Sequence, residues 1–177
     1  MNYDKLLHIG TEEVQVGFHK SYHYHRYEPT PYEHLEQLFR EFPLREADHI
    51  VDFGCGKGRL NFYIHYVFQS TVKGVEINED FYHQALHNLE RYAKNRKKKK
   101  EKIHFYLGRA EDYFVQPEDN YFYFFNPFSL PIFQKLLVIS YTHWKKVVAR
   151  STLFSISPQM NIDFLWIIMH YSNSKER

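Results

Sequence analysis

Apolar positions follow two different periods along the chain, and the two periods alternate. Short apolar runs of strand length are separated by longer segments in which apolar residues recur every three or four positions. The runs predict four strands, at 49–53, 71–77, 103–107 and 121–125, and a fifth at 151–156. The longer segments predict helices at 31–42, from Leu60 to Phe68, from Asn78 to about Tyr92, and from Ile132 to Trp144. Residues 163–169 fit either a short helix or a strand.

This alternation predicts an α/β fold with a mainly parallel sheet between two layers of helices, a three-layer Rossmann-like sandwich. Pro31 is well placed to start the first helix, and Pro43 ends it. We therefore expect a flanking segment over residues 1–30 and one domain over 31–177. Ligands of such sheets bind beyond the carboxyl ends of the strands.

Composition narrows the class of protein. The chain has 177 residues, of which 44% are hydrophobic and 19% aromatic, which is enough for one packed core. No apolar run approaches the roughly 20 residues of a membrane span, and the first ten residues lack the pattern of a signal peptide. The single cysteine, Cys55, excludes an internal disulfide. We expect a cytoplasmic protein with no membrane partner.

The small net charge of +2 hides one strongly basic segment. Arg91–Lys102 holds eight basic residues and one acid, so the rest of the chain is net acidic. Such a run fits a solvated loop, and it also fits RNA binding, because lysines that neutralise phosphates release counterions. His19, His23 and His25 have a loose metal-ligand spacing without a fourth ligand, so we expect no metal site.

Three of the seven glycines stand at positions 54, 56 and 58, in the stretch VDFGCGKGRL between the first strand and the next helix. Glycine permits positive φ and lets a ligand approach bare backbone. The Ser/Thr of a phosphate-binding Walker loop and the third glycine of a dinucleotide fingerprint are both absent. What fits is an acid, Asp52, followed by G-x-G-x-G.

This motif is similar to the first motif of the class I S-adenosylmethionine-dependent methyltransferases, and the resemblance covers about residues 31–157. It implies that the glycines pass under the methionine part of the cofactor and that Asp52 lies near its ammonium group. Glu76, 24 residues after Asp52, ends the second strand, where an acid accepts ribose hydroxyls. The implied cofactor-binding residues are Asp52, Gly54, Cys55, Gly56, Gly58, Glu76, Ile77, Ala110, Glu111 and Asn126.

Two further motifs extend the resemblance. YLGRAED (106–112) resembles the family's adenine-contacting loop, with Glu111 or Asp112 as its acid. YFYFFNPFS (121–129) is similar to the Asn/Asp-Pro-Pro-aromatic motif of methyltransferases that act on nitrogen, although this chain has one proline rather than two. In that motif an Asn side chain and the next carbonyl accept hydrogen bonds from the target amine, and the ring stacks on it. The implied catalytic residues of an in-line methyl transfer are Asn126, Pro127 and Phe128.

Three functions remain open. The NPF motif and the lysine run favour a nitrogen of ribosomal or transfer RNA as the methyl acceptor. The segments PTPYEHLEQL, GKGRL and GVEIN also resemble small protein-lysine methyltransferases, which favours a protein lysine or a small amine. The third function is an inactive cofactor-binding protein.

The carboxyl end of the chain supports that third function. Only 20 residues follow Ser157, and they do not resemble the last two strands that most family members have. The sequence therefore predicts a sheet without these strands, with an exposed edge that favours a homodimer.

Overall fold

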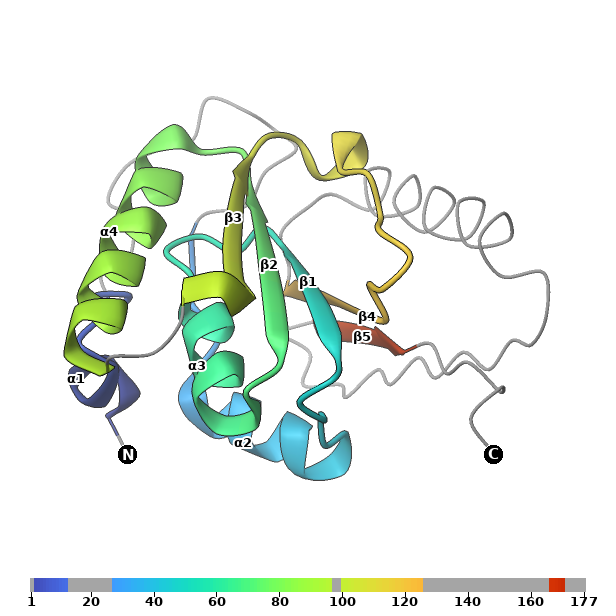
Figure 1. The fold of residues 1–177 in the computed structure, drawn as a ribbon, viewed down its shortest axis with the longest axis horizontal. Coiled ribbons are helices and arrows are strands. Elements are labelled where there is room, and N and C mark those ends of the chain that lie inside the picture. Colours follow the sequence, from blue (N-terminus) through green and yellow to red (C-terminus); the bar gives the residue numbers. More distant parts are fainter. Residues whose placement is uncertain (1, 13–26, 97–99, 126–165, 171–177) are drawn as a thin grey trace, which may run out of the picture.

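A five-stranded sheet forms the centre of the protein in the computed structural model, which describes residues 2–12, 27–96, 100–125 and 166–170 (Figure 1). Its strands stand in the order β3-β2-β1-β4-β5. The first four are parallel to one another, and β5 runs antiparallel to β4. The strands are β1 (His49–Phe53), β2 (Thr71–Glu76), β3 (Ile103–Leu107), β4 (Tyr121–Phe125) and β5 (Trp166–His170).

The four parallel strands confirm the sequence prediction to within one residue. Of the predicted helix or strand at 163–169, the described part, 166–169, belongs to strand β5. β5 pairs along the outer side of β4, so β4 is not an edge strand, and β5 is antiparallel, an orientation that the sequence did not predict. The predicted strand at 151–156 and helix from Ile132 to Trp144 lie outside the described residues.

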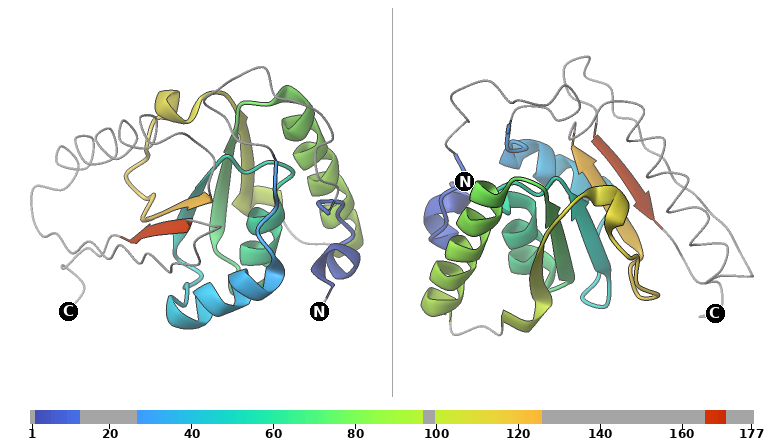
Figure 2. Two further views of the ribbon diagram at one scale, coloured as in Figure 1. Left: turned by 180° about the vertical axis from the view of Figure 1, so that it is seen from behind. Right: turned by 90° about the horizontal axis from the view of Figure 1, so that it is seen from above.

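Within the described ranges, four α-helices cover one face of the sheet (Figure 2, right view). They are α1 (Tyr3–Leu7), α2 (Tyr32–Glu41), α3 (Arg59–Phe68) and α4 (Glu79–Arg96), and two short 3-10 helices are η1 (Lys100–Lys102) and η2 (Ala110–Asp112). The Asn78 side-chain oxygen caps α4, because it accepts the N–H groups of Asp80 and Phe81 at 3.0 and 3.2 Å. The sequence predicted α2, α3 and α4 but not α1.

The two faces of the sheet bury different sets of side chains, as expected for parallel strands covered on both sides. The helical face packs Leu35, Leu38, Leu60 and Ile64 of α2 and α3 on Ile50, Val72, Tyr121 and Tyr123. The other face packs Ala110 and Val115, which follow β3, on Val51, Phe53, Val75, Phe122 and Phe124. β1, β2 and β4 are therefore fixed by packing from both sides, which holds their carboxyl ends in place.

Residues 2–12 pack against the helical layer. Leu7 and Ile9 are buried in a cluster with Phe62, Tyr92 and Ile103. Asn88 of α4 completes this contact: it accepts the Gly10 N–H at 2.9 Å and donates to the carbonyls of Gly10 and Lys57 at 3.2 and 3.1 Å. The domain boundary at residue 31 stays a prediction. None of the helices in the described ranges is long and apolar enough to cross a membrane.

Candidate functional site

The carboxyl ends of β1, β2 and β3 meet at one edge of the sheet, and backbone hydrogen bonds join the loops that follow them. The N–H groups of Gly54 and Cys55 donate to the Val75 carbonyl at 2.8 and 3.2 Å. The Gly108 N–H donates to the Glu76 carbonyl at 2.9 Å. The three sequence motifs that follow β1, β2 and β3 are thus brought together in space, as predicted for ligand-binding ends of parallel strands.

All three glycines of the loop have left-handed backbone, with φ of 81° at Gly54, 54° at Gly56 and 85° at Gly58. The chain's own rings fill the space beside two of them. A Cβ at Gly56 would lie 2.2 Å from Tyr27 Cε2, and one at Gly58 would lie 2.8 Å from the Phe105 ring. The sequence predicted that these glycines serve a ligand, whereas the rings of Tyr27 and Phe105 already leave no room for a side chain at positions 56 and 58.

Glu76 lies at the carboxyl end of β2 and is 7% exposed. One of its carboxylate oxygens accepts the Gly56 N–H and the other accepts the Asn78 N–H, both at 2.8 Å. The carboxylate therefore holds the glycine loop and the start of α4 in register. This is the position that the sequence predicted for an acid at the site.

Asp52 lies in β1 and is 4% exposed. Its carboxylate faces the Asn61 amide of α3, with 3.1 Å between the Asp52 oxygen and the amide nitrogen. Burial raises the pKa of Asp52 well above its usual range, and the nearby charge of Glu76 raises it further. A buried acid beside a second acid is an environment that a cationic ligand stabilises.

Cys55 also lies in the loop, and its thiol packs in the protein interior. A Cβ at Gly74 would lie 2.7 Å from the Cys55 sulfur, so the thiol fills the space over β2. Burial raises the pKa of Cys55 well above its usual range, and the charges of Asp52 and Glu76 add to this. A neutral thiol is a poor nucleophile, so the structure favours a packing role for this side chain.

The loop after β3 carries the predicted adenine-contacting residues. Ile77 is 39% exposed beside it, whereas Ala110 is buried in the core cluster of the non-helical face. The Glu111 carboxylate accepts from Arg109 Nε and Nη2 at 3.1 and 2.5 Å. An adenine contact of Glu111 stays a prediction. The predicted catalytic residues Asn126, Pro127 and Phe128 lie outside the described residues.

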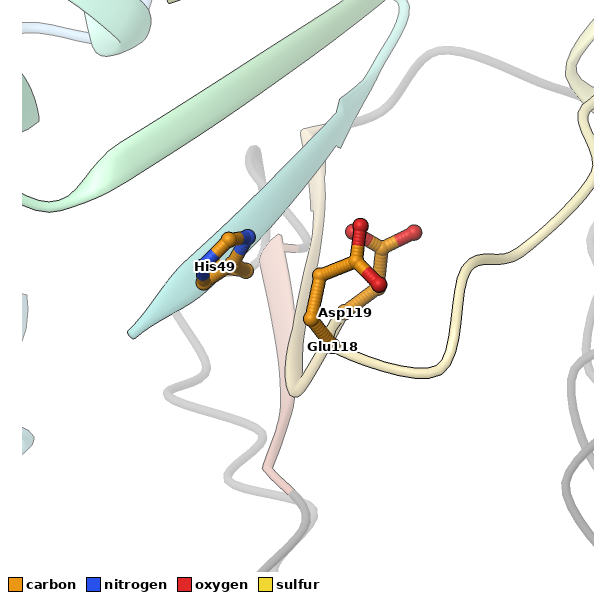
Figure 3. A group of neighbouring side chains, drawn as sticks. All are labelled: His49, Glu118 and Asp119. Atoms are coloured by element: carbon orange, nitrogen blue, oxygen red, sulfur yellow. The ribbon is translucent and has the colours of Figure 1, made fainter. Parts of the chain in front are cut away.

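A second acidic cluster lies at the opposite end of the strands and has the ligand types of a metal site. Figure 3 shows His49 at the start of β1 beside Glu118 and Asp119, whose side chains come from the segment before β4. Candidate ligand atoms of these three residues lie within 4.8 Å of one another. However, the Lys73 ammonium is 2.6 Å from Asp119 and 3.1 Å from Glu118. The lysine already supplies the positive charge that a metal ion would bring.

The pKa shifts in this cluster agree with its charge balance. Burial alone would lower the pKa of Lys73, but the hydrogen bonds and charges of Asp119 and Glu118 outweigh burial and raise it. Burial and the Lys73 charge lower the pKa of His49. The cluster is a structural ion network, and we infer no metal site from it.

Sequence reasoning missed several residues near the glycine loop. Tyr27, whose ring lies on Gly56, comes from the segment 1–30 that the sequence analysis treated as flanking. Sequence motifs indicated no role for Arg59 beyond its place in the motif GKGRL. In the structure its side chain connects α3 to Thr11 and Thr30. No periodicity marks these contacts, because the partners are far apart in the sequence.

Comparisons with known proteins match no family model and no curated protein. Among solved structures, an RNA methyltransferase from Salinibacter ruber, in complex with S-adenosyl-L-homocysteine, is similar over 85% of this chain and 98% of its own, with a TM-score of 0.55 and 14% identity. A SAM-dependent methyltransferase from Thiobacillus denitrificans matches 48% of this chain (TM-score 0.41, 20% identity), and a protein-L-isoaspartate O-methyltransferase matches 55% (0.44, 16%).

This chain spans about a third of the length of some of these proteins: 32% of the Thiobacillus enzyme and 28% of the isoaspartate enzyme. The Salinibacter structure, by contrast, is matched along nearly its whole length. Its likeness rests on the three-dimensional arrangement and not on sequence, since identity is 14%. The four parallel strands in the order 3-2-1-4 accordingly form a Rossmann-like fold of the methyltransferase type.

Proposed function

We propose that this protein is an S-adenosylmethionine-dependent methyltransferase. The observation that carries the proposal is the pair of buried acids, Asp52 and Glu76, at the carboxyl ends of adjacent parallel strands. The left-handed glycine loop lies between them, and Glu76 is bonded to it through Gly56. S-adenosylmethionine carries a sulfonium and an ammonium group, so two buried acids at one end of the sheet, of which Asp52 has its pKa raised by burial and by the charge of Glu76, fit the charge of this cofactor.

The cofactor would supply an activated methyl group, and the chain's residues would hold and orient the reactants. Glu76 is the residue placed to accept ribose hydroxyls, and Asp52 is the acid for the positive end of the cofactor. Asn126 and the Pro127 carbonyl are proposed to orient a nitrogen nucleophile, with the Phe128 ring against it. An amine can lose its proton after attack, so this chemistry needs no strong general base.

The proposed methyl acceptor is a nitrogen of RNA. A groove of about 610 Å³ between residues 4–12 and α4 supports this proposal. Lys5, His8, His87 and Arg91 line it, and Arg91 is also the first residue of the basic segment 91–102. Lys5 of α1 and Arg91 of α4 bring positive charge to this groove, whose lining also includes Asp4 and Glu12, and positive charge suits a chain of phosphates. The Salinibacter structure with a similar fold is named as an RNA methyltransferase.

Calorimetric titration with S-adenosylmethionine and S-adenosylhomocysteine tests the cofactor. We expect micromolar binding that Glu76→Ala weakens at least tenfold, which corresponds to about 1.4 kcal/mol. Absence of binding by a folded wild-type chain would overturn the methyltransferase proposal and favour an inactive protein.

The RNA acceptor is tested separately, by the salt dependence of binding to a labelled single-stranded RNA. We expect Arg91→Ser to weaken binding and to reduce the slope of log K against log salt by about one. Arg40→Ser is the matched control, because Arg40 is an exposed arginine on α2 that does not line the groove. Equal slopes for the two variants, with cofactor binding intact, would favour a protein lysine or a small amine as the acceptor.

A further inference from the structure

Tyr27 connects the two loops that form the candidate cofactor site. Its ring lies directly on Gly56, since a Cβ there would be 2.2 Å from Tyr27 Cε2. The same ring packs against Phe81 in the first turn of α4, with 4.8 Å between the ring centroids. Lys57 Nζ lies 5.2 Å from the ring centroid. The ring therefore lies over the carboxyl ends of both β1 and β2.

A buried polar network holds this ring in place. The Tyr27 hydroxyl donates to the Thr11 carbonyl at 2.9 Å. Thr11 is bound in turn to the Asp4 carboxylate, to which its N–H donates at 2.6 Å and its hydroxyl at 2.8 Å. Asp4 is 4% exposed and Thr11 is fully buried. Burying the carboxylate that holds this ring costs desolvation free energy, and a loop exposed on the surface would not need such a buried network.

Arg59 joins this network to the glycine loop. It is the first residue of α3, directly after Gly58, and its Nε donates to the Thr11 hydroxyl at 2.7 Å. Its Nη1 donates to the Thr30 carbonyl at 3.3 Å. The Thr30 hydroxyl is 2.9 Å from the Tyr123 hydroxyl of β4. The segment from Tyr27 to Thr30 thus crosses from the glycine loop to β4, over the end of the sheet where the site lies.

The position of Tyr27 relative to Glu76 limits where a ligand can lie. The Gly56 N–H that contacts the Glu76 carboxylate belongs to the residue on which the Tyr27 ring rests. A ligand hydroxyl bonded to Glu76 is therefore next to this ring. No ligand fits between the ring and Gly56, because they are already in contact. Tyr27 itself is only partly buried, so part of its surface is left to contact a ligand.

We propose that Tyr27 is a cofactor-contacting residue that forms a wall of the site beside the nucleoside half of the cofactor. Asp4, Thr11 and Arg59 are positioning residues that hold the ring. The inference rests on the proposed function, since it needs the cofactor to bind at Glu76. Part of the segment 1–30 would then belong to the cofactor site, and Gly56 would lack a side chain because the Tyr27 ring occupies that space.

The test is calorimetric titration of Tyr27 variants with S-adenosylhomocysteine and with 5′-methylthioadenosine, which has the nucleoside half but no amino-acid half. We expect Tyr27→Ala to weaken both ligands about tenfold and Tyr27→Phe to keep both within about twofold of wild type, because the ring is retained. Tyr27→Leu serves if Tyr27→Ala does not fold, since it keeps apolar bulk on Gly56 and loses the ring.

Tyr3→Ala is the matched control for lost aromatic packing. Tyr3 packs against Tyr32 and Tyr63 through α1 and makes no contact with the glycine loop in the described residues. We expect this variant to lower the melting temperature and to leave both affinities unchanged. If wild type and Tyr27→Ala bind both ligands with equal affinity, this inference alone is overturned. The same holds if Tyr27→Ala loses affinity for S-adenosylhomocysteine but not for 5′-methylthioadenosine. Absence of binding by the wild type would instead overturn the proposed function as well.

Discussion

Two pairs of acidic side chains lie at opposite ends of the same parallel strands, and their surroundings differ. Asp52 and Glu76 are at the carboxyl ends, where burial and like charge raise the pKa of Asp52. Glu118 and Asp119 are at the amino ends, where Lys73 forms ion pairs with both. The second pair carries its own cation, and its charge is balanced within the chain. A positively charged ligand would offset the burial and the like-charge repulsion of the first pair. We therefore propose that the first pair binds a ligand and that the second pair stabilises the fold.

The largest expected effect comes from removing the cation of the structural pair. Lys73→Met leaves Asp119 buried beside Glu118 without its counter-charge. We expect the free energy of unfolding to fall by about 3 kcal/mol, measured by urea denaturation. The double variant Lys73→Met/Asp119→Asn should recover part of this loss. If Lys73→Met unfolds at the wild-type urea concentration, the network does not stabilise the fold and the contrast between the two pairs is lost.

A binding experiment tests the Asp52–Glu76 pair in the same comparison. Glu76→Gln keeps the shape of the side chain but removes one acceptor for the Gly56 and Asn78 N–H groups. We expect affinity for S-adenosylhomocysteine to fall at least tenfold, or about 1.4 kcal/mol. Glu118→Gln makes the same chemical change at the other pair and should leave the affinity unchanged. Equal losses in the two variants would show that binding depends on general stability.

The smallest expected effect is on the pH dependence of stability. Because the pKa of Asp52 is raised in the folded state, the folded chain keeps this proton to higher pH than the unfolded chain does. The free energy of unfolding therefore decreases as pH rises from the unfolded value of about 4 towards the folded pKa. Asp52→Asn should remove this decrease and stabilise the chain at neutral pH, on the order of 1 kcal/mol.

Urea denaturation of the Asp52→Asn variant at a series of pH values measures that change. Asp119→Asn provides the comparison, because it removes the partner of Lys73 and should destabilise the chain at neutral pH. A pH profile of Asp52→Asn that parallels the wild-type profile would mean that Asp52 does not hold the extra proton.

Local pattern was sufficient to predict the parallel strands and the helices between them. β1 and β3 agree with the predicted bounds because their apolar runs are short and end in polar or glycine residues. Asn78 predicted the start of α4 because its cap depends on adjacent residues. By contrast, α1 has five residues, and its stability comes from burying Leu7 against distant parts of the chain. A helix of that length has no periodic signal in the sequence.

The candidate site shows the same difference between features that local motifs predict and contacts between residues far apart in the sequence. Asp52 and Glu76 lie near the carboxyl ends of their strands and the glycines follow β1, so local motifs predicted that these residues come together; their roles in binding stay a prediction. Tyr27 contacts the loop from 29 residues upstream of Gly56, and no local motif encodes a contact over that separation. Likewise, the sequence did not predict that β5 pairs antiparallel with β4, because the two strands are about 40 residues apart.

Asn88 has a consequence for the order in which the chain assembles. It makes its hydrogen bonds to Gly10 across 78 residues of sequence, and a third bond reaches Lys57. During synthesis the first dozen residues therefore leave the ribosome long before their partner on α4 exists. Closing so long a loop is slow relative to pairing neighbouring elements. Residues 2–12 are made before α4 and are nevertheless among the last to reach their native contacts, and until then the groove beside α4 has only one wall.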